Sequence, residues 1–270
     1  TEIYTLSLHD ALPISSNSNP LYLKLAFEEA RLWTSYQPLE HLAIGVRGII
    51  KENMFDRLSN EGNHGEVLVS HALGYLAASR NGLSEDELVD LLSRDPDVYE
   101  WFFNQTYHLP ADLLTLTIDY LEEHPDFASQ ILAESHLEGE RLAMAWLKQK
   151  RTPPEPVREF IREVIQQENG PRLPIVLWSR LSFDLDPYLT NRTVDNYTLL
   201  SFFHREIGEV ASEVFLEGDA NTTFHSKLAK YFLDKADPLG DRSWQGTSIH
   251  ALSEIPRSEE HTSELQSPNT

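Results

Sequence analysis

The chain contains no cysteine, which excludes disulfide bonds, thiol chemistry and cysteine-ligated metal sites. Basic residues are scarce, since 22 lysines and arginines face 43 acidic residues and the formal net charge is −21. A surface this acidic repels phosphate backbones and anionic membranes, so nucleic acid and membrane partners are not expected. No apolar run reaches the roughly 18 residues that a membrane-spanning helix needs. These absences favour a cytoplasmic location.

The sequence also lacks the usual signatures of catalysis. It has no G-x-x-x-x-G-K-[ST] phosphate-binding loop and no apolar strand ending in paired acids for magnesium, so we predict that this chain does not hydrolyse ATP by itself. The histidines show no close ligand spacing, and no metal site is predicted. Asp86 and Glu87 are adjacent acids beside a helix start, and we expect both on a solvated face rather than in an acid–base role.

The two ends of the chain resemble translated sequencing adapters. Residues 1–14 and 257–267 match in-frame translations of the oligonucleotides that are ligated to DNA for short-read sequencing, and RSEEHTSELQ back-translates into such an adapter codon by codon. We therefore expect 1–14 and 257–270 to be adapter-derived tails rather than native sequence. The stretch between them is then expected to be a fragment that lacks domains on both sides.

Residues 15–65 are predicted to form a helical part. Asn19 and Pro20 are typical of a helix start, and apolar residues follow at helical spacing. The predicted apolar face of this helix consists of Leu23, Ala26, Phe27 and Ala30, and it is widened by Leu21, Leu25 and Leu32. We therefore expect the helix to be largely buried. A second helix is expected over 44–58, followed by a glycine-marked loop at 62–65.

Residues 66–235 are predicted to form a winged-helix-like domain. Its first helix is expected to end at a C-cap formed by Asn81 and Gly82. Ser84 and Glu87, three residues apart, form the pattern of a capping box that begins the next helix. The predicted buried residues are Val69, Ala72, Leu73 and Leu76 in the first helix and Leu88, Leu91 and Leu92 in the second.

Two β-prone runs, 187–193 and 197–203, flank residues 194–196 and predict a hairpin. Two amphipathic helices are expected after it. Their apolar residues are Phe203, Ile207, Val210, Ala211 and Val214 in one and Phe224, Leu228, Tyr231 and Phe232 in the other. The acidic section at about 104–170 is interpreted as a helical insertion, and 236–256 as the start of a linker to a C-terminal region. The predicted fold class is therefore mainly α: a helical bundle followed by a winged-helix-like domain with a small β-hairpin.

Three stretches together resemble the C-terminal half of the nucleotide-binding module in STAND-class signal-transduction ATPases of the NACHT type. They are NPLYLKLAFEEARLW at 19–33, GLSEDELVDLLS at 82–93, and LPIVLWSRLSFDLDPYL with LLSFFHRE at 173–189 and 199–206. The resemblance is closest to NACHT proteins that continue into WD-repeat propellers or tetratricopeptide arrays. It implies partners within the same chain, namely an N-terminal nucleotide-binding domain and C-terminal repeats, and a homo-oligomer when activated.

The resemblance also implies two nucleotide contacts. Pro20 would match the proline that packs against the adenine ring of ADP or ATP, since a rigid ring without an N–H offers an apolar surface to a flat base. His204 would match the winged-helix histidine that reaches the phosphates of ADP and holds the closed state. It is followed by Arg205 rather than the commoner aspartate. Without the family, Pro20 is a first-turn proline and His204 a half-buried histidine that satisfies a local carbonyl.

Three functions are compared. The first is a regulatory region that couples ADP or ATP, bound with magnesium by the missing domain, to opening and oligomerisation, with no cofactor bound by the fragment alone. The second is a winged-helix DNA-binding regulator, which is disfavoured because the expected exposed helix carries acids and only Arg192 marks the wing. Those acids are Glu85, Asp86, Glu87 and Asp90. The third is a helical scaffold with no nucleotide dependence.

Overall fold

The chain divides into two compact units, Thr1–Leu91 with Ile175–Thr270 and Leu92–Pro174. The computed structural model describes residues 19–33, 41–105, 172–194, 197–246 and 248–254. The predicted tails at 1–14 and 257–270 lie outside the described residues, as does the predicted insertion apart from its first two positions. Among the described helices, none has the length and apolar character needed to cross a membrane.

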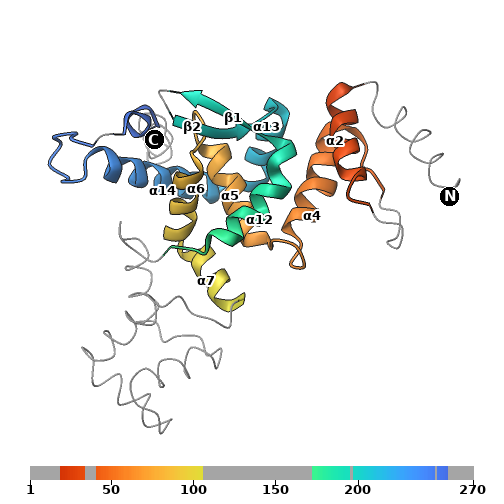
Figure 1. Ribbon diagram of the computed structural model, residues 1–270, viewed down its shortest axis with the longest axis horizontal. Coiled ribbons are helices and arrows are strands. Elements are labelled where there is room, and N and C mark those ends of the chain that lie inside the picture. The colour runs from red at the N-terminus through yellow and green to blue at the C-terminus, as the bar shows by residue number, and fades with distance from the viewer. Residues whose placement is uncertain (1–18, 34–40, 106–171, 195–196, 247, 255–270) are drawn as a thin grey trace, which may run out of the picture. The chain divides into compact units, whose positions relative to one another are not determined.

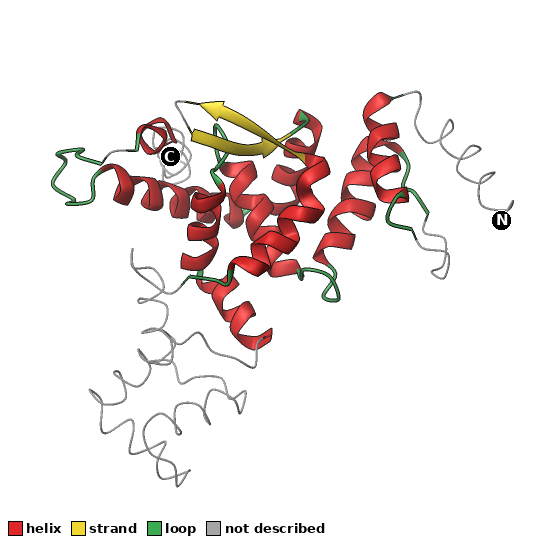
Figure 2. Ribbon diagram, in the orientation of Figure 1, coloured by secondary structure: helices red, strands yellow, loops and turns green. Residues whose placement is uncertain are grey.

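The first unit is mainly helical, with one small hairpin (Figures 1 and 2). Its elements are α2 (Pro20–Ala30), α3 (Gly45–Gly48), η1 (Ile49–Phe55), α4 (Asp56–Ser59), α5 (Glu66–Ala78), the first part of α6 (Glu85–Arg94), α12 (Ile175–Leu185), η2 (Asp186–Tyr188), β1 (Leu189–Val194), β2 (Tyr197–Phe202), α13 (Arg205–Phe215) and α14 (Asp219–Ala236). The second unit contains α7 (Pro96–Gln105). Helices with a single two-stranded antiparallel sheet confirm the predicted fold class.

The helix α2 begins where the sequence predicts. The side-chain oxygen of Asn19 accepts hydrogen bonds from the backbone N–H groups of Leu21 and Tyr22, at 2.9 and 3.4 Å. Pro20 occupies the first turn, where its missing N–H costs no intrahelical hydrogen bond. An asparagine cap followed by proline therefore accounts for the start of this helix.

The buried face of α2 differs from the predicted one. Its buried side chains are Tyr22, Leu25, Ala26 and Glu29. Leu23 and Phe27 are 42% and 58% exposed, so the prediction that they lie in the core was wrong. The true stripe has the same helical spacing but is shifted by one residue. It includes Glu29, a carboxylate that a count of apolar residues passes over.

The helix predicted over 44–58 forms as a continuous segment of α3, η1 and α4, with a π-helical centre. The N–H of Asp56 donates to the carbonyl of Lys51, five residues earlier, which is the wider turn that defines a π-helix. Asn53 in this turn accepts from the N–H of Ala43 at 2.9 Å and donates to the carbonyl of His41 at 3.0 Å. The apolar pattern indicates a helix but not this change of pitch.

The helices α5 and α6 bury the apolar residues that the sequence predicts for the first unit, and α5 also packs against α4, α13, α14 and β2. The capping box is confirmed, because Ser84 N–H donates to Glu87 Oε2 at 2.8 Å and Glu87 N–H donates to Ser84 Oγ at 3.2 Å. The predicted C-cap at Asn81 and Gly82 was wrong. The helix α5 ends at Ala78, and Ser79 leaves it in an extended conformation.

Gly82 instead allows two backbones to approach each other. Leu83 N–H donates to the carbonyl of Leu200 at 3.1 Å, and Leu200 N–H donates to the carbonyl of Leu83 at 2.7 Å. Gly82 has a φ of +94°, and a Cβ there would overlap the carbonyl oxygen of Leu200. This position therefore requires glycine for its left-handed backbone and for the close contact with the hairpin.

The hairpin is confirmed and has a regular register. The strands β1 and β2 pair antiparallel from Leu189 opposite Phe202 to Val194 opposite Tyr197. The two helices that follow bury Ile207, Val210 and Ala211 in α13 and Phe224, Leu228, Tyr231 and Phe232 in α14. The hairpin lies along one side of the helices, in teal in Figure 1.

Candidate functional site

Pro20 lies on α2 and His204 at the start of α13, and both helices contact α3 and η1 within the first unit. We define the helical–wing interface as the contacts that the segment from α2 to α4 makes with α13, with Tyr188 before the hairpin and with Phe203 after it. One of these contacts places the ammonium nitrogen of Lys24 3.5 Å from the centre of the Phe203 ring. Lys24 lies one turn after Pro20, and Phe203 directly precedes His204.

A buried carboxylate joins three elements at this interface. Glu29 of α2 accepts two hydrogen bonds from the Arg57 guanidinium of α4, at 2.8 and 3.0 Å, and a third from the Tyr188 hydroxyl of η2 at 2.7 Å. Glu29 is 4% exposed and Tyr188 is 1% exposed. Nearby, His64 Nε2 lies 2.8 Å from a carboxylate oxygen of Asp184 in α12. The Glu29 cluster is the principal buried polar connection that we identify between the helical part and the start of the hairpin.

The ionisation of this cluster follows from its burial and charges. Burial and the adjacent negative charge of Glu29 raise the pKa of Tyr188 well above its usual value, so the phenol remains a hydrogen-bond donor. Burial alone would lower the pKa of Arg57, but its hydrogen bonds and attraction to Glu29 raise it. The cluster is therefore a charged pair with a neutral donor added to it.

Solvent-accessible ion pairs also connect α3 and η1 to α13. Arg47 of α3 lies 2.9 Å from a Glu206 carboxylate oxygen and also pairs with Glu213, and Lys51 lies 3.6 Å from Glu213. The hydrogen bond from Arg47 lowers the pKa of Glu213. All four side chains are between 31% and 52% exposed. Solvent and salt screen such pairs, so they contribute much less than the buried cluster.

Pro20 and His204 are both exposed at the surface of the first unit. His204 is the N-cap of α13, and its Nδ1 accepts a hydrogen bond from Glu206 N–H at 3.1 Å. It thus caps a helix through a backbone N–H rather than satisfying a carbonyl. A neutral imidazole that accepts through Nδ1 carries its proton on Nε2, so the free edge of the ring is a donor. Within the described residues, no hydrogen bond joins Pro20 to His204.

No family model and no solved structure matches the chain. It is 33% identical over 214 residues to NACHT domain- and WD repeat-containing protein 1 of Homo sapiens and 30% identical over 214 residues to its counterpart in Mus musculus. The chain is homologous to part of the NACHT and WD repeat-containing proteins. This finding confirms the resemblance that the three stretches indicate.

The similarity covers 79% of this chain and 10% of each of these relatives. NACHT and WD repeat domain-containing protein 2 of Homo sapiens is 26% identical over 223 residues, which is 82% of this chain and 9% of that protein. The chain thus spans about a tenth of the length of the NACHT and WD repeat proteins that it matches.

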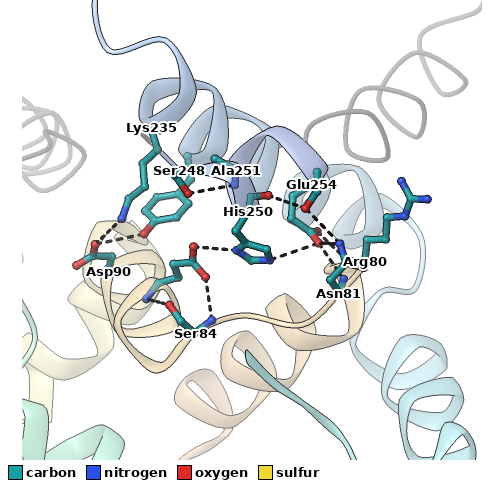
Figure 3. Close-up of polar contacts among 12 residues, drawn as sticks. Arg80, Asn81, Ser84, Asp90, Lys235, Ser248, His250, Ala251 and Glu254 are labelled. Carbon is teal, nitrogen blue, oxygen red and sulfur yellow. Dashed lines mark hydrogen bonds and ion pairs between the residues drawn. The ribbon is translucent and has the colours of Figure 1, made fainter. Parts of the chain in front are cut away.

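A second buried polar cluster, which the sequence did not predict, surrounds His250 in this NACHT-related chain (Figure 3). Glu87, expected on a solvated face, is 5% exposed, and its Oε1 lies 2.9 Å from Nδ1 of His250. Burial alone would raise the pKa of Glu87, but the hydrogen bond from His250 lowers it. Burial alone would lower the pKa of His250, but the nearby carboxylate of Glu254 and the hydrogen bond to Glu87 raise it to about 9. The sequence feature that involves Glu87 is the capping box, which explains the hydrogen bond to one of its carboxylate oxygens but not to the other.

A polar pocket of about 780 Å³ lies beside α4. Glu52 and Asp56 contribute two carboxylates to its lining, and the Arg57 guanidinium that also lines it is already paired with Glu29. Neither Pro20 nor His204 belongs to this lining. The two carboxylates repel a phosphate group, and the arginine is already paired with Glu29. The pocket is therefore not the predicted nucleotide site.

Proposed function

We propose that this region is the regulatory helical and winged-helix part of a nucleotide-switched signalling ATPase of the NACHT type. ADP or ATP, together with magnesium, binds to a nucleotide-binding domain outside this chain. The ADP state holds the protein closed as a monomer, and exchange for ATP opens it and permits oligomerisation. The proposal is supported by the sequence relationship to NACHT and WD repeat proteins.

The observation that carries the nucleotide contact is the hydrogen bond at the start of α13. Because His204 Nδ1 accepts from Glu206 N–H, the neutral ring presents Nε2–H on its exposed side. A phosphate oxygen is a good acceptor for such a donor, and the bond requires no change in the cap. In this proposal His204 caps α13 through Nδ1 and donates to a phosphate through Nε2, whereas the sequence alternative was a half-buried histidine that satisfies a local carbonyl.

The adenine contact of Pro20 rests on a different feature. Pro20 is exposed in the first turn of α2, and the Asn19 cap holds its ring at the end of the helix. A second domain can therefore place a base against it without rearranging α2. In this proposal the Glu29 cluster holds α2 against the winged-helix part. A displacement of α2 on nucleotide exchange is therefore transmitted to the hairpin and α13.

The test uses the complete protein that contains this region, loaded with a fluorescent ADP analogue and chased with unlabelled ATP. His204→Asn keeps a side-chain acceptor for the α13 cap, but its shorter amide no longer places an N–H donor at the position of Nε2. A hydrogen bond to a charged phosphate is worth about 1.5–3 kcal/mol, so ADP release is expected to accelerate roughly 10- to 100-fold.

The control is Glu209→Gln, an exchange of a half-exposed residue one turn further along α13. It is expected to leave ADP release unchanged. If His204→Asn releases ADP at the rate of the unchanged protein while α13 remains folded, His204 is not the nucleotide sensor.

A further inference from the structure

Residues 249–254 form a short helix that covers the loop between α5 and α6 (Figure 3). Its inward side chains are almost fully buried, with His250 at 3%, Ala251 at 0% and Glu254 at 2% exposure. This region was expected to begin a linker. Its polar side chains instead take part in specific contacts with a loop about 170 positions earlier in the chain.

The Glu254 carboxylate is bound by the loop that follows α5. One oxygen accepts from the backbone N–H of Arg80 at 2.8 Å, and the other accepts from the backbone N–H of Asn81 at 2.8 Å and from its side-chain amide at 2.9 Å. Three converging donors form a binding site for a single carboxylate, of the kind that captures acidic groups through backbone amides. The loop is thus held by a residue from the far end of the chain.

His250 lies between two carboxylates. Its Nδ1 is 2.9 Å from Glu87 Oε1, and its Nε2 is 3.6 Å from Glu254 Oε1. A neutral imidazole has one proton and can serve only one of these oxygens, leaving a nitrogen lone pair directed at the other carboxylate. Only the imidazolium, with a proton on each nitrogen, attracts both. A positive charge at His250 therefore adds an attraction to Glu254 across 3.6 Å, beyond hydrogen-bond distance, to the three donors that already bind that carboxylate.

We propose that His250 and Glu254, with Arg80, Asn81 and Glu87, form a detachable C-terminal clasp that holds the segment after the winged helix against the α5–α6 loop while His250 is protonated. Loss of that proton releases the segment and frees the loop. The inference is independent of the nucleotide mechanism, since none of these residues is assigned a nucleotide contact. Through the clasp, release of the segment at 249–254 would be coupled to release of the loop at the start of α6.

The groups around His250 support a charge-dependent clasp. Glu87 faces it from α6 and Glu254 from its own helix, while β2 presents the Tyr197 ring at 5.9 Å and α14 presents the uncharged Phe232 ring at 5.4 Å. Further along α6 and α14, Asp90 accepts from the Tyr231 hydroxyl and lies 3.5 Å from the ammonium of Lys235. The carboxylates closest to the ring therefore dominate its charge state.

The pH range follows from the signs of the shifts. The pKa of His250 is raised from 6.5 to about 9, so its stabilising contribution is complete below about pH 6.5 and is lost as pH rises through 9. The pKa of Glu87 is lowered from 4.5, so its contribution is complete above about pH 4.5 and is lost at more acidic pH. The clasp is therefore closed at neutral pH and opens on the alkaline side.

Amide hydrogen exchange of the 270-residue chain tests the proposal, with rates corrected for the intrinsic effect of pH. Between pH 7 and pH 10, protection at 80–84 and 249–254 is expected to fall together by at least tenfold, while the core of α5 stays protected. In His250→Gln and Glu254→Gln, protection of both segments is expected to be lost already at pH 7 and to change little at pH 10. His41→Gln, which alters an exposed histidine, is the matched control and should behave as the unchanged chain.

Nuclear magnetic resonance of the unchanged chain supplies a second measurement that needs no variant. The His250 imidazole should titrate well above an ordinary histidine, and amide signals of 80–84 should shift with the same midpoint. Titration of His250 near 6.5, or full protection of 249–254 at pH 10 with a deprotonated ring, would overturn the proposal. So would independent responses of the two segments, because the clasp requires them to separate together.

Discussion

The Glu29 cluster allows a quantitative prediction about the helical–wing interface. Tyr188→Phe removes one hydroxyl and leaves the ring in place. Its partner oxygen on Glu29 still accepts from Arg57 at 3.0 Å, so no carboxylate oxygen becomes unpaired. Removal of a single hydrogen bond to a charged group should therefore lower the free energy of unfolding by about 1.5 kcal/mol, the lower end of the usual range.

Arg57→Met should be considerably more damaging, because it leaves the 4%-exposed carboxylate of Glu29 without a counter-charge. Breaking a buried ion pair in this way costs about 3–5 kcal/mol. Glu29→Gln added to Arg57→Met should recover part of this loss, since the amide still accepts from the Tyr188 hydroxyl but carries no charge. Non-additivity of the two exchanges is the characteristic expected of a buried charge pair.

Urea unfolding of the 270-residue chain, followed by circular dichroism, measures these differences. The matched control is Arg31→Met, because Arg31 pairs with Glu28 on the same helix but is 62% exposed, and its loss should cost no more than about 0.5 kcal/mol. Equal losses for Arg57→Met and Arg31→Met would refute the reasoning. A double variant less stable than Arg57→Met alone would refute it as well.

Four further exchanges test other parts of the structure. Gly82→Ala should lower the free energy of unfolding by at least about 2 kcal/mol, because a Cβ at positive φ meets the hairpin backbone, and thermal unfolding would measure it. Ala26→Glu should destabilise the chain by more than about 3 kcal/mol, whereas Phe27→Glu should change stability by less than about 1 kcal/mol. A loss for Phe27→Glu as large as that for Ala26→Glu would restore the predicted face of α2, which contains both residues. Arg47→Ala should cause a small loss of stability that disappears in 1 M salt, and a loss independent of salt would contradict screening of these exposed pairs.

Local rules of the sequence predicted much of the fold of the first unit. The capping box at Ser84 and Glu87, the proline at the start of α2 and the hairpin between two β-prone runs each depend on residues close together in the chain. In such cases the physical cause lies within a few positions, so the pattern is sufficient. The family resemblance likewise rested on contiguous stretches, and the comparisons confirm it.

The remaining errors have long-range causes. Gly82 reads as a helix C-cap, but its role is set by Leu200, more than a hundred positions away. Glu87 was predicted to be solvated and Glu29 was passed over, because their partners, Arg57, Tyr188 and His250, are distant in sequence. A single sequence does not show which carboxylate will bind which distant donor. A count of apolar residues also does not detect a buried charged residue.

The π-helical turn of η1 has a consequence for how this region tolerates change in length. A turn that bonds five residues back instead of four contains one residue more than a regular helix would, and each residue rotates the following side chains by about 100°. Deleting one position from 49–55 would restore ordinary pitch and leave Arg57 on the side of the helix that faces α2. Single-residue losses among related chains should therefore be tolerated better here than in the regular helix α5, where a deletion rotates every side chain that follows.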